Sequence, residues 1–279
     1  MKVLRHRVER HRCSEGTLRY RTYGAGPPVL LVHGLSGSGL WWKHNVDAFA
    51  QHFTVYVVEL KGYGTNRSWR PLRLQAAADC LASLIATLPH GRAHVVGHSM
   101  GGHISVHLAA QHPNQVDRLV LASASGLVRS DLLHMAFRLP WAAWHSPLNF
   151  APVLARDALR AGPVNLLLST LDILKDDTTT ALAKIVAPTL LVWGQHDVLV
   201  PPALGTAAQE LLRGSQLVVI DGAGHNVMWD RPADFNRVVL EFLRKERAEV
   251  DTTQMPNADT LGIEDLHALQ KEARGQSSS

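Results

Sequence analysis

The sequence predicts an α/β protein in which a mostly parallel sheet is covered by helices. Two observations predict this class. Short apolar runs alternate along the chain with longer runs that are amphipathic or rich in alanine and leucine, a pattern typical of strands and helices in alternation. The chain has 279 residues, of which 46% are hydrophobic, so it is also long enough to bury a substantial core.

The first half of the chain begins with an expected hairpin and then alternates. "HRCSEGTLRYRTYG" (11–24) has a glycine between two short alternating runs, which favours an antiparallel hairpin at the sheet edge. The expected strands are "PVLLVHG" (28–34), "TVYVVEL" (54–60) and "AHVVGH" (93–98). The expected helices cover 41–53, 74–88 and 100–113, and Pro113 ends the last of these.

The second half repeats the alternation after a long interruption. The expected strands are 116–124, 188–194 and 215–221, and the expected helices lie near 202–213 and 232–246, the second begun by Asp230 or Pro232. Residues 126–185 are rich in Leu, Ala and Trp with several prolines, and they predict an insertion of short helices. Residues 247–279 predict a polar, flexible tail with one candidate helix around 262–273. We therefore expect a core of 1–125 and 186–246.

Charge and cysteine content exclude several classes of protein. The 28 Lys and Arg against 24 Asp and Glu give a net charge of +4 without a basic cluster, which argues against nucleic-acid binding. The start of the chain lacks the apolar stretch of a signal peptide, and long apolar runs are missing, so we expect no stable membrane insertion. Cys13 and Cys80 form neither a disulfide framework nor a metal-type spacing, which favours a reduced, cytoplasmic setting.

Three motifs follow expected strands and carry chemistry. "GHSMG" (97–101) matches G-x-S-x-G between a strand and a helix, where a sharp turn would expose Ser99. Gly97 and Gly101 would let the strand and the helix approach closely. "WGQHD" and "DGAGHN" place Asp197 and His225 on loops at the carboxyl ends of later strands, the edge at which Ser99 also emerges.

With these motifs the chain resembles the α/β-hydrolase family from roughly residue 15 to residue 246. The resemblance implies a predominantly parallel eight-stranded sheet with flanking helices and a helical cap at 126–185. It implies that Ser99 is the nucleophile on a nucleophile elbow, His225 the base and Asp197 the group that orients the imidazole. It also implies an oxyanion hole made by the backbone N–H groups of Leu35 and Met100. No cofactor is expected.

Four histidines flank Ser99 in the sequence, and none of them is expected to be its base. His98 precedes the serine on the strand end, so its side chain should point to the opposite side. His94 and His98 are expected to pack or to hydrogen-bond within the sheet region. His107 is expected to be partly exposed on the helix, about 12 Å along its axis from the turn.

His103 and His107 raise the question of a metal site. Their i, i+4 spacing can hold zinc, as in H-E-x-x-H. The residue after His103 is Ile104 rather than Glu, and no third ligand is apparent in the sequence. We therefore expect no metal.

The segment "VVELKGYGTN" (57–66) departs from the family pattern Asp-x-Pro-Gly-x-Gly-x-Ser. Glu59, Lys61 and Asn66 replace its residues, while Gly62 and Gly64 remain. The departure affects a structural turn and not the catalytic residues.

The candidate substrate pocket combines the loop after the first buried strand with the cap. His33 and Gly34 belong to "HGLSGSG", and His33 is expected to order the Leu35 loop. Aromatic side chains of the cap either line an apolar acyl pocket or attach the cap helices to the core. These side chains are Phe137, Trp141, Trp144 and Phe150, together with Leu148.

The leading functional hypothesis is a carboxylesterase-like serine hydrolase. Its substrate would be a small-molecule ester with a small to medium apolar acyl group. The same scaffold also resembles carbon–carbon bond hydrolases, lactonases and perhydrolases. A hydrolase-like receptor with slow turnover, or a structural protein, are the alternatives from other classes. The natural substrate and the oligomeric state cannot be inferred from the sequence.

Overall fold

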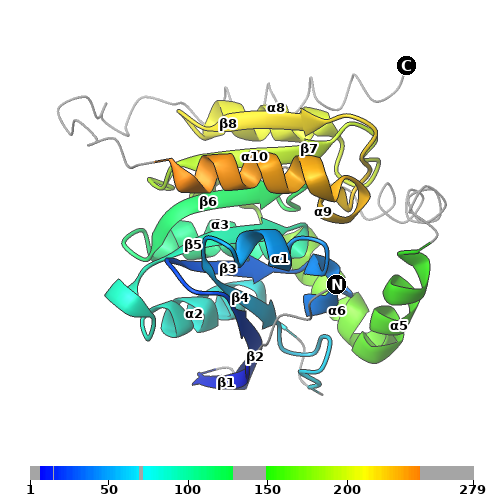
Figure 1. The fold of residues 1–279 in the computed structure, drawn as a ribbon. Helices are drawn as coiled ribbons and strands as arrows, with labels where there is room; N and C mark the ends of the chain where they lie inside the picture. Colours follow the sequence, from blue (N-terminus) through cyan, green and yellow to red (C-terminus); the bar gives the residue numbers. More distant parts are fainter. Residues whose placement is uncertain (1–6, 15, 69–71, 128–148, 246–279) are drawn as a thin grey trace.

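The structure is a computed structural model that describes residues 7–14, 16–68, 72–127 and 149–245. Its eight strands form one sheet in the order β1-β2-β4-β3-β5-β6-β7-β8 (Figure 1). Only the pairs β1·β2 and β2·β4 are antiparallel, so the predicted fold class is confirmed. The strands are β1 (Arg7–Cys13), β2 (Gly16–Tyr23), β3 (Pro28–Val32), β4 (Thr54–Glu59), β5 (Ala93–His98), β6 (Val116–Ala122), β7 (Thr189–Gly194) and β8 (Gln216–Ile220).

Helices cover both faces of the sheet, which explains why its inner strands are apolar without alternation. The helices of the core are α1 (Val46–Phe49), α2 (Leu74–Ile85), α3 (Met100–Gln111), α8 (Pro202–Leu211), α9 (Val227–Asp230) and α10 (Pro232–Arg244), with short 3₁₀ helices η1 (Gly39–Trp42) and η2 (Pro89–Gly91). On β3, Leu30 and Val32 pack into the cluster that includes α2, α3 and α8, while Val29 and Leu31 pack into the cluster that includes α1 and α10. Figure 1 shows α1 and α10 in front of the sheet.

The single helix predicted over 41–53 is wrong. The structure has η1 and the one-turn helix α1 in its place. The Ser38 hydroxyl accepts a hydrogen bond from the Leu40 N–H (3.2 Å) and so caps a tight 3₁₀ turn. Asn45 then separates η1 from α1, because its side-chain amide donates a hydrogen bond to the Met228 carbonyl (3.0 Å) of a distant segment. Tertiary contacts therefore override the helical pattern here.

The described part of the insertion contains α5 (Ala151–Ala161), α6 (Pro163–Lys175) and α7 (Thr179–Leu182). Figure 1 shows α5 and α6 on the side toward which β7 and β8 point. Buried polar contacts join these helices to the core. The Ser38 hydroxyl donates to Asp157 (2.6 Å) on α5, and the Asn165 amide on α6 donates to the Gly62 carbonyl (3.2 Å). The rest of the predicted cap, and the whole tail at 247–279 with its candidate helix, lie outside the described residues.

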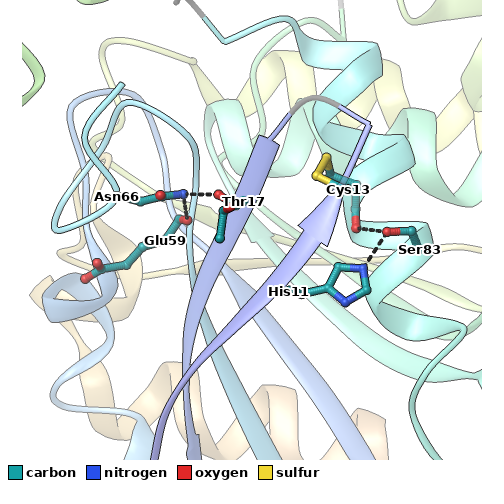
Figure 2. The surroundings of a disulfide bond; sticks show 7 residues. His11, Cys13, Thr17, Glu59, Asn66 and Ser83 are labelled. Carbon is teal, nitrogen blue, oxygen red and sulfur yellow. Dashed lines mark hydrogen bonds between the residues drawn. A yellow bond between two sulfur atoms is a disulfide. The ribbon is translucent and has the colours of Figure 1, made fainter. Parts of the chain in front are cut away.

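Cys13 and Cys80 form a disulfide bond, so the expectation that these cysteines make no disulfide framework is wrong (Figure 2). The β1–β2 hairpin lies beside α2, and this brings Cys13 on β1 to Cys80 on α2 across 67 residues of sequence. His11 and Ser83 form a hydrogen bond (2.6 Å) next to the disulfide. Disulfides persist in oxidising compartments, so the basis for expecting a reduced setting is removed. Among the described residues no helix is long and apolar enough to cross a membrane.

We predict that Cys80→Ser lowers the free energy of unfolding by about 2–4 kcal/mol, because the disulfide closes a long loop and so restricts the unfolded chain. Urea unfolding measures the change. Reductant should lower the stability of the native protein by the same amount and leave Cys80→Ser unchanged. An unfolding midpoint that does not respond to reductant in the native protein would contradict the prediction.

Candidate active site

Ser99 lies at the turn between β5 and α3 with an unusual backbone conformation. Its φ is 50° and its ψ is −118°, a region that residues other than glycine rarely adopt and that is found mainly at functional sites. The Ser99 N–H donates to the Ala122 carbonyl (3.0 Å), and the Ser99 carbonyl accepts from the N–H of His103 (3.0 Å). Hydrogen bonds on both sides thus hold the turn in this conformation.

Gly97 and Gly101 make this turn possible, as predicted from the motif. A Cβ on Gly97 would lie 2.5 Å from the Gly101 carbonyl oxygen, and a Cβ on Gly101 would lie 2.3 Å from the Val32 carbonyl oxygen. Strand β5, helix α3 and strand β3 therefore approach each other at distances that exclude any side chain. This close packing fixes the position of Ser99 relative to the sheet.

The structure brings Ser99, His225 and Asp197 together from three separate loops. His225 Nε2 lies 3.1 Å from Ser99 Oγ, and His225 Nδ1 lies 2.9 Å from Asp197 Oδ2. Asp197 follows β7 and His225 follows β8, so both occupy the carboxyl edge of the sheet. In this geometry the imidazole is within reach of the serine proton.

The Asp197 carboxylate is held rigidly and is almost inaccessible to solvent. It is 3% exposed, and its Oδ1 accepts the N–H groups of Leu199 (3.0 Å) and Val200 (2.9 Å). Its Oδ2 is left for His225. Because Asp197 Oδ2 can only accept a hydrogen bond from His225 Nδ1, His225 carries its proton on Nδ1 and presents the lone pair of Nε2 to Ser99.

His98 supports His225 and does not serve Ser99. Its Nε2 donates to the His225 carbonyl (3.0 Å), and its ring lies between Trp41 (5.7 Å between centroids) and His225 (5.0 Å). Burial holds the pKa of His98 well below its ordinary value, so the ring is neutral. His94 packs against the ring of Phe53 at 5.6 Å, which agrees with its predicted place in the sheet region.

The loop after β3 is organised by His33. Its Nδ1 donates to the Gly34 carbonyl (2.9 Å) and its Nε2 accepts from the Leu60 N–H (3.2 Å). His33 is fully buried, and burial lowers its pKa. The side chain therefore shapes the Leu35 loop, as expected, and is not part of an open pocket wall. Gly34 does lie beside the nucleophile, because a Cβ on it would be 3.0 Å from the Ser99 Cβ.

The predicted aromatic pocket is only partly within the described residues. Phe137, Trp141 and Trp144 lie outside them, as does Leu148. Phe150 is fully buried, with its ring 5.2 Å from Trp41 and 4.7 Å from Trp229. Phe150 therefore attaches the insertion to the core and does not line an apolar pocket.

Glu59 explains how the turn at 60–66 forms without the family pattern. Its carboxylate accepts hydrogen bonds from the N–H (2.8 Å) and the hydroxyl of Thr65, and it pairs with Arg21 (3.3 Å). Burial alone would raise the pKa of Glu59, but these hydrogen bonds and the arginine charge hold it below its ordinary value. Asn66 donates to the carbonyls of Thr17 and Glu59 (Figure 2).

The structure differs from the sequence-based expectation at His107, which is expected to be partly exposed but is 4% exposed.

Asp230 and Pro232 are the two residues considered as the start of the last helix, and Pro232 is confirmed because α10 begins there. The Asp230 carboxylate instead accepts the N–H of Gly224 (2.8 Å), the residue before His225. Its place in "GHNVMWD", a few residues after the histidine, is a signal that could have identified it.

Asp230 is a partly buried acid, and ionising its carboxyl group destabilises the folded state. Burial raises its pKa to about 6 from an ordinary value of 3.8. The folded state thus keeps this proton up to about pH 6, while the unfolded chain releases it near pH 4. Because the folded state binds more protons in this window, stability from Asp230 falls as the pH rises through it.

We predict that Asp230→Asn stabilises the protein at pH 7.5 by roughly 1 kcal/mol more than at pH 5. The amide oxygen of asparagine can still accept the Gly224 N–H, and asparagine does not titrate. Urea unfolding at the two pH values measures the difference. Asp234→Asn, at an exposed carboxylate of α10, is the matched control and should show no such dependence. An equal effect of Asp230→Asn at both pH values would refute the assignment.

Comparison with known proteins identifies the family of the chain. A model of the alpha/beta hydrolase family matches residues 29–238. The chain is 31% identical to the 2-hydroxy-6-oxononadienedioate/2-hydroxy-6-oxononatrienedioate hydrolase of Burkholderia vietnamiensis, with 83% of this chain and 92% of the relative covered.

Solved structures show the same fold. A hydrolase from Pseudomonas aeruginosa is 25% identical, with a TM-score of 0.73, covering 85% of this chain and 98% of that one. A thermophilic esterase from Thermogutta terrifontis is 24% identical, with a TM-score of 0.75 and the same coverage of 85% and 98%. The family match spans most of the chain and includes Ser99, Asp197 and His225. The chain is thus a member of the α/β hydrolase family.

Proposed function

We propose that the protein is a serine hydrolase that cleaves a carboxylic ester with a small to medium apolar acyl group. The observation that carries this proposal is the continuous chain of hydrogen bonds from Ser99 Oγ to His225 and from His225 to Asp197. A serine hydroxyl is a poor nucleophile until a neighbouring base accepts its proton. His225 is placed and oriented to do so.

The proposed reaction proceeds through an acyl-enzyme in two halves. Ser99 Oγ attacks the carbonyl carbon of the ester while His225 Nε2 takes the hydroxyl proton, and Asp197 stabilises the imidazolium that results. The C–O bond to the alcohol then breaks, and His225 returns the proton to the leaving alkoxide oxygen. Water, activated by the same imidazole, hydrolyses the acyl-enzyme and releases the acid.

The negative oxygen of the tetrahedral intermediate needs hydrogen-bond donors. Met100 is the first residue of α3, so its N–H is among those that a helix leaves without an intrahelical partner, at the positive end of the helix dipole. Leu35 lies in a tight turn closed by the Gly37 N–H and the Gly34 carbonyl (3.0 Å). We assign the oxyanion hole to the backbone N–H groups of Leu35 and Met100.

The preference for an apolar acyl group rests on the insertion, which we propose to be a cap over Ser99. Its α5 is attached to the loop that contains Leu35 through Asp157 and Ser38. Phe137, Trp141 and Trp144, which lie outside the described residues, remain the candidate pocket residues of this cap, and Gly34 is the candidate from the core.

A second candidate is hydrolysis of a carbon–carbon bond by the same three residues. The relative from Burkholderia vietnamiensis favours it, because that protein is named a hydrolase of an oxo dicarboxylate. A 2-hydroxy-6-oxo-dienoate tests this candidate directly, since its cleavage removes the conjugated chromophore. Turnover of this compound together with failure on every ester would replace the first proposal by the second.

We predict that the protein hydrolyses p-nitrophenyl esters with a preference for short to medium acyl chains, and that Ser99→Ala or His225→Ala lowers kcat/KM by at least about 10³-fold. Release of p-nitrophenolate over a series of acyl lengths measures this. Ser125→Ala is the matched control, because Ser125 contacts the same turn only through its N–H, which donates to the Ser99 carbonyl (3.2 Å). Rates that are equal in the native protein and in Ser99→Ala would refute the nucleophile.

A further inference from the structure

His103, His107 and Asp176 converge on one point away from the Ser99 hydroxyl. His103 Nε2 lies 2.7 Å from Asp176 Oδ2, and His107 Nε2 contacts the same oxygen. The three candidate ligand atoms lie within 4.8 Å of one another. Both histidines belong to α3, while Asp176 directly follows α6 in the insertion, 69 residues beyond His107.

The helix itself aligns the two histidines. Residues four apart lie on the same face of an α-helix, and the rings of His103 and His107 are stacked with their centroids 5.4 Å apart and an interplanar angle of 29°. Both Nε2 atoms point to the same side as a result. Asp176 supplies the third ligand that is not apparent from the sequence, because the insertion folds back onto α3.

We propose that His103, His107 and Asp176 form a zinc site. Two imidazole nitrogens and one carboxylate oxygen are ligands that Zn²⁺ prefers, and three protein ligands leave a fourth position for water. Zinc–ligand bonds of about 2.0–2.2 Å require the ligand atoms to lie roughly 3.3 Å apart, so the 2.7 Å between His103 Nε2 and Asp176 Oδ2 would have to lengthen. The Asp176 side chain is 22% exposed, so it is not enclosed on every side.

The residues around the three ligands determine how zinc reaches the site and how tightly it binds. Asp172 and Asp176 line a surface hollow of about 410 Å³, through which an ion can reach the site. In the zinc-bound form each imidazole carries its proton on Nδ1. His103 Nδ1 has no hydrogen-bond partner in the described structure, and such missing support weakens metal sites by about 10- to 100-fold. We therefore expect micromolar rather than nanomolar affinity.

The site would fasten the insertion to the helix beneath the nucleophile. The N–H of His103 donates to the Ser99 carbonyl, and the His103 ring lies against Gly126, where a Cβ would be 2.2 Å from it. The Gly126 carbonyl accepts the hydroxyl of Thr178 (2.6 Å) from the other end of the insertion. Both ends of the insertion thus meet at His103, one turn below Ser99. The role is structural, and it does not depend on the proposed function.

The test is zinc binding by the tag-free full chain, measured by equilibrium dialysis against ZnCl₂ and elemental analysis. We expect about one zinc ion per chain in the native protein, and at least about tenfold weaker binding in Asp176→Asn and in His107→Gln. His112→Gln is the matched control: His112 ends the same helix and pairs with Asp79 (3.2 Å) without a second histidine. Its zinc binding should equal that of the native protein.

Cobalt provides a measurement that needs no variant. Co²⁺ bound to two imidazoles and a carboxylate in a tetrahedral site should give visible absorption bands that ZnCl₂ abolishes, and zinc should raise the Tm of the native protein. Native protein that retains no zinc at 50 µM free metal, roughly the weak limit of the expected range, would overturn the proposal. Equal binding by Asp176→Asn, His107→Gln and His112→Gln would do the same, since it would show adventitious surface binding only.

Discussion

The close approach of β3, β5 and α3 around Ser99 is the constraint on which the site depends. At Gly97 and Gly101 the backbones meet at distances that leave no space for a side chain. The chain must therefore turn sharply between β5 and α3, and Ser99 takes a conformation that is unfavourable for serine. The same turn leads directly into α3, which begins at Met100. The position of Ser99 and the start of the helix are thus set by one turn.

The remaining groups reach this turn from loops at the carboxyl edge of the sheet. His225 is supported from two sides, because His98 donates to its carbonyl and Asp230 holds the N–H of the preceding Gly224. Asp197 is held by two backbone N–H groups. The insertion is attached to the core by separate polar contacts from α5 and α6. A rigid sheet edge thus carries the site, and an added helical segment lies beside it.

Much of the fold and the three central residues could be predicted because their signals are local. A buried strand needs only a short apolar run, and G-x-S-x-G needs only a strand before it and a helix after it. The break at Asn45, the Cys13–Cys80 disulfide and the burial of His107 could not be predicted in this way. Each depends on a partner far away in the sequence: Met228 for Asn45, α2 for Cys13 and Asp176 for His107. Such pairings follow from how the elements pack, which local pattern does not encode.

Covalent labelling by a fluorophosphonate, with the modified peptide identified by mass spectrometry, measures most directly whether His225 activates Ser99. This reagent requires a serine activated by a neighbouring base. We expect one phosphonyl group per chain, located on Ser99, and labelling that is slowed by at least about 10²-fold in His225→Ala. Labelling of another serine, or labelling of Ser99 at an unchanged rate in His225→Ala, would show that His225 does not activate Ser99.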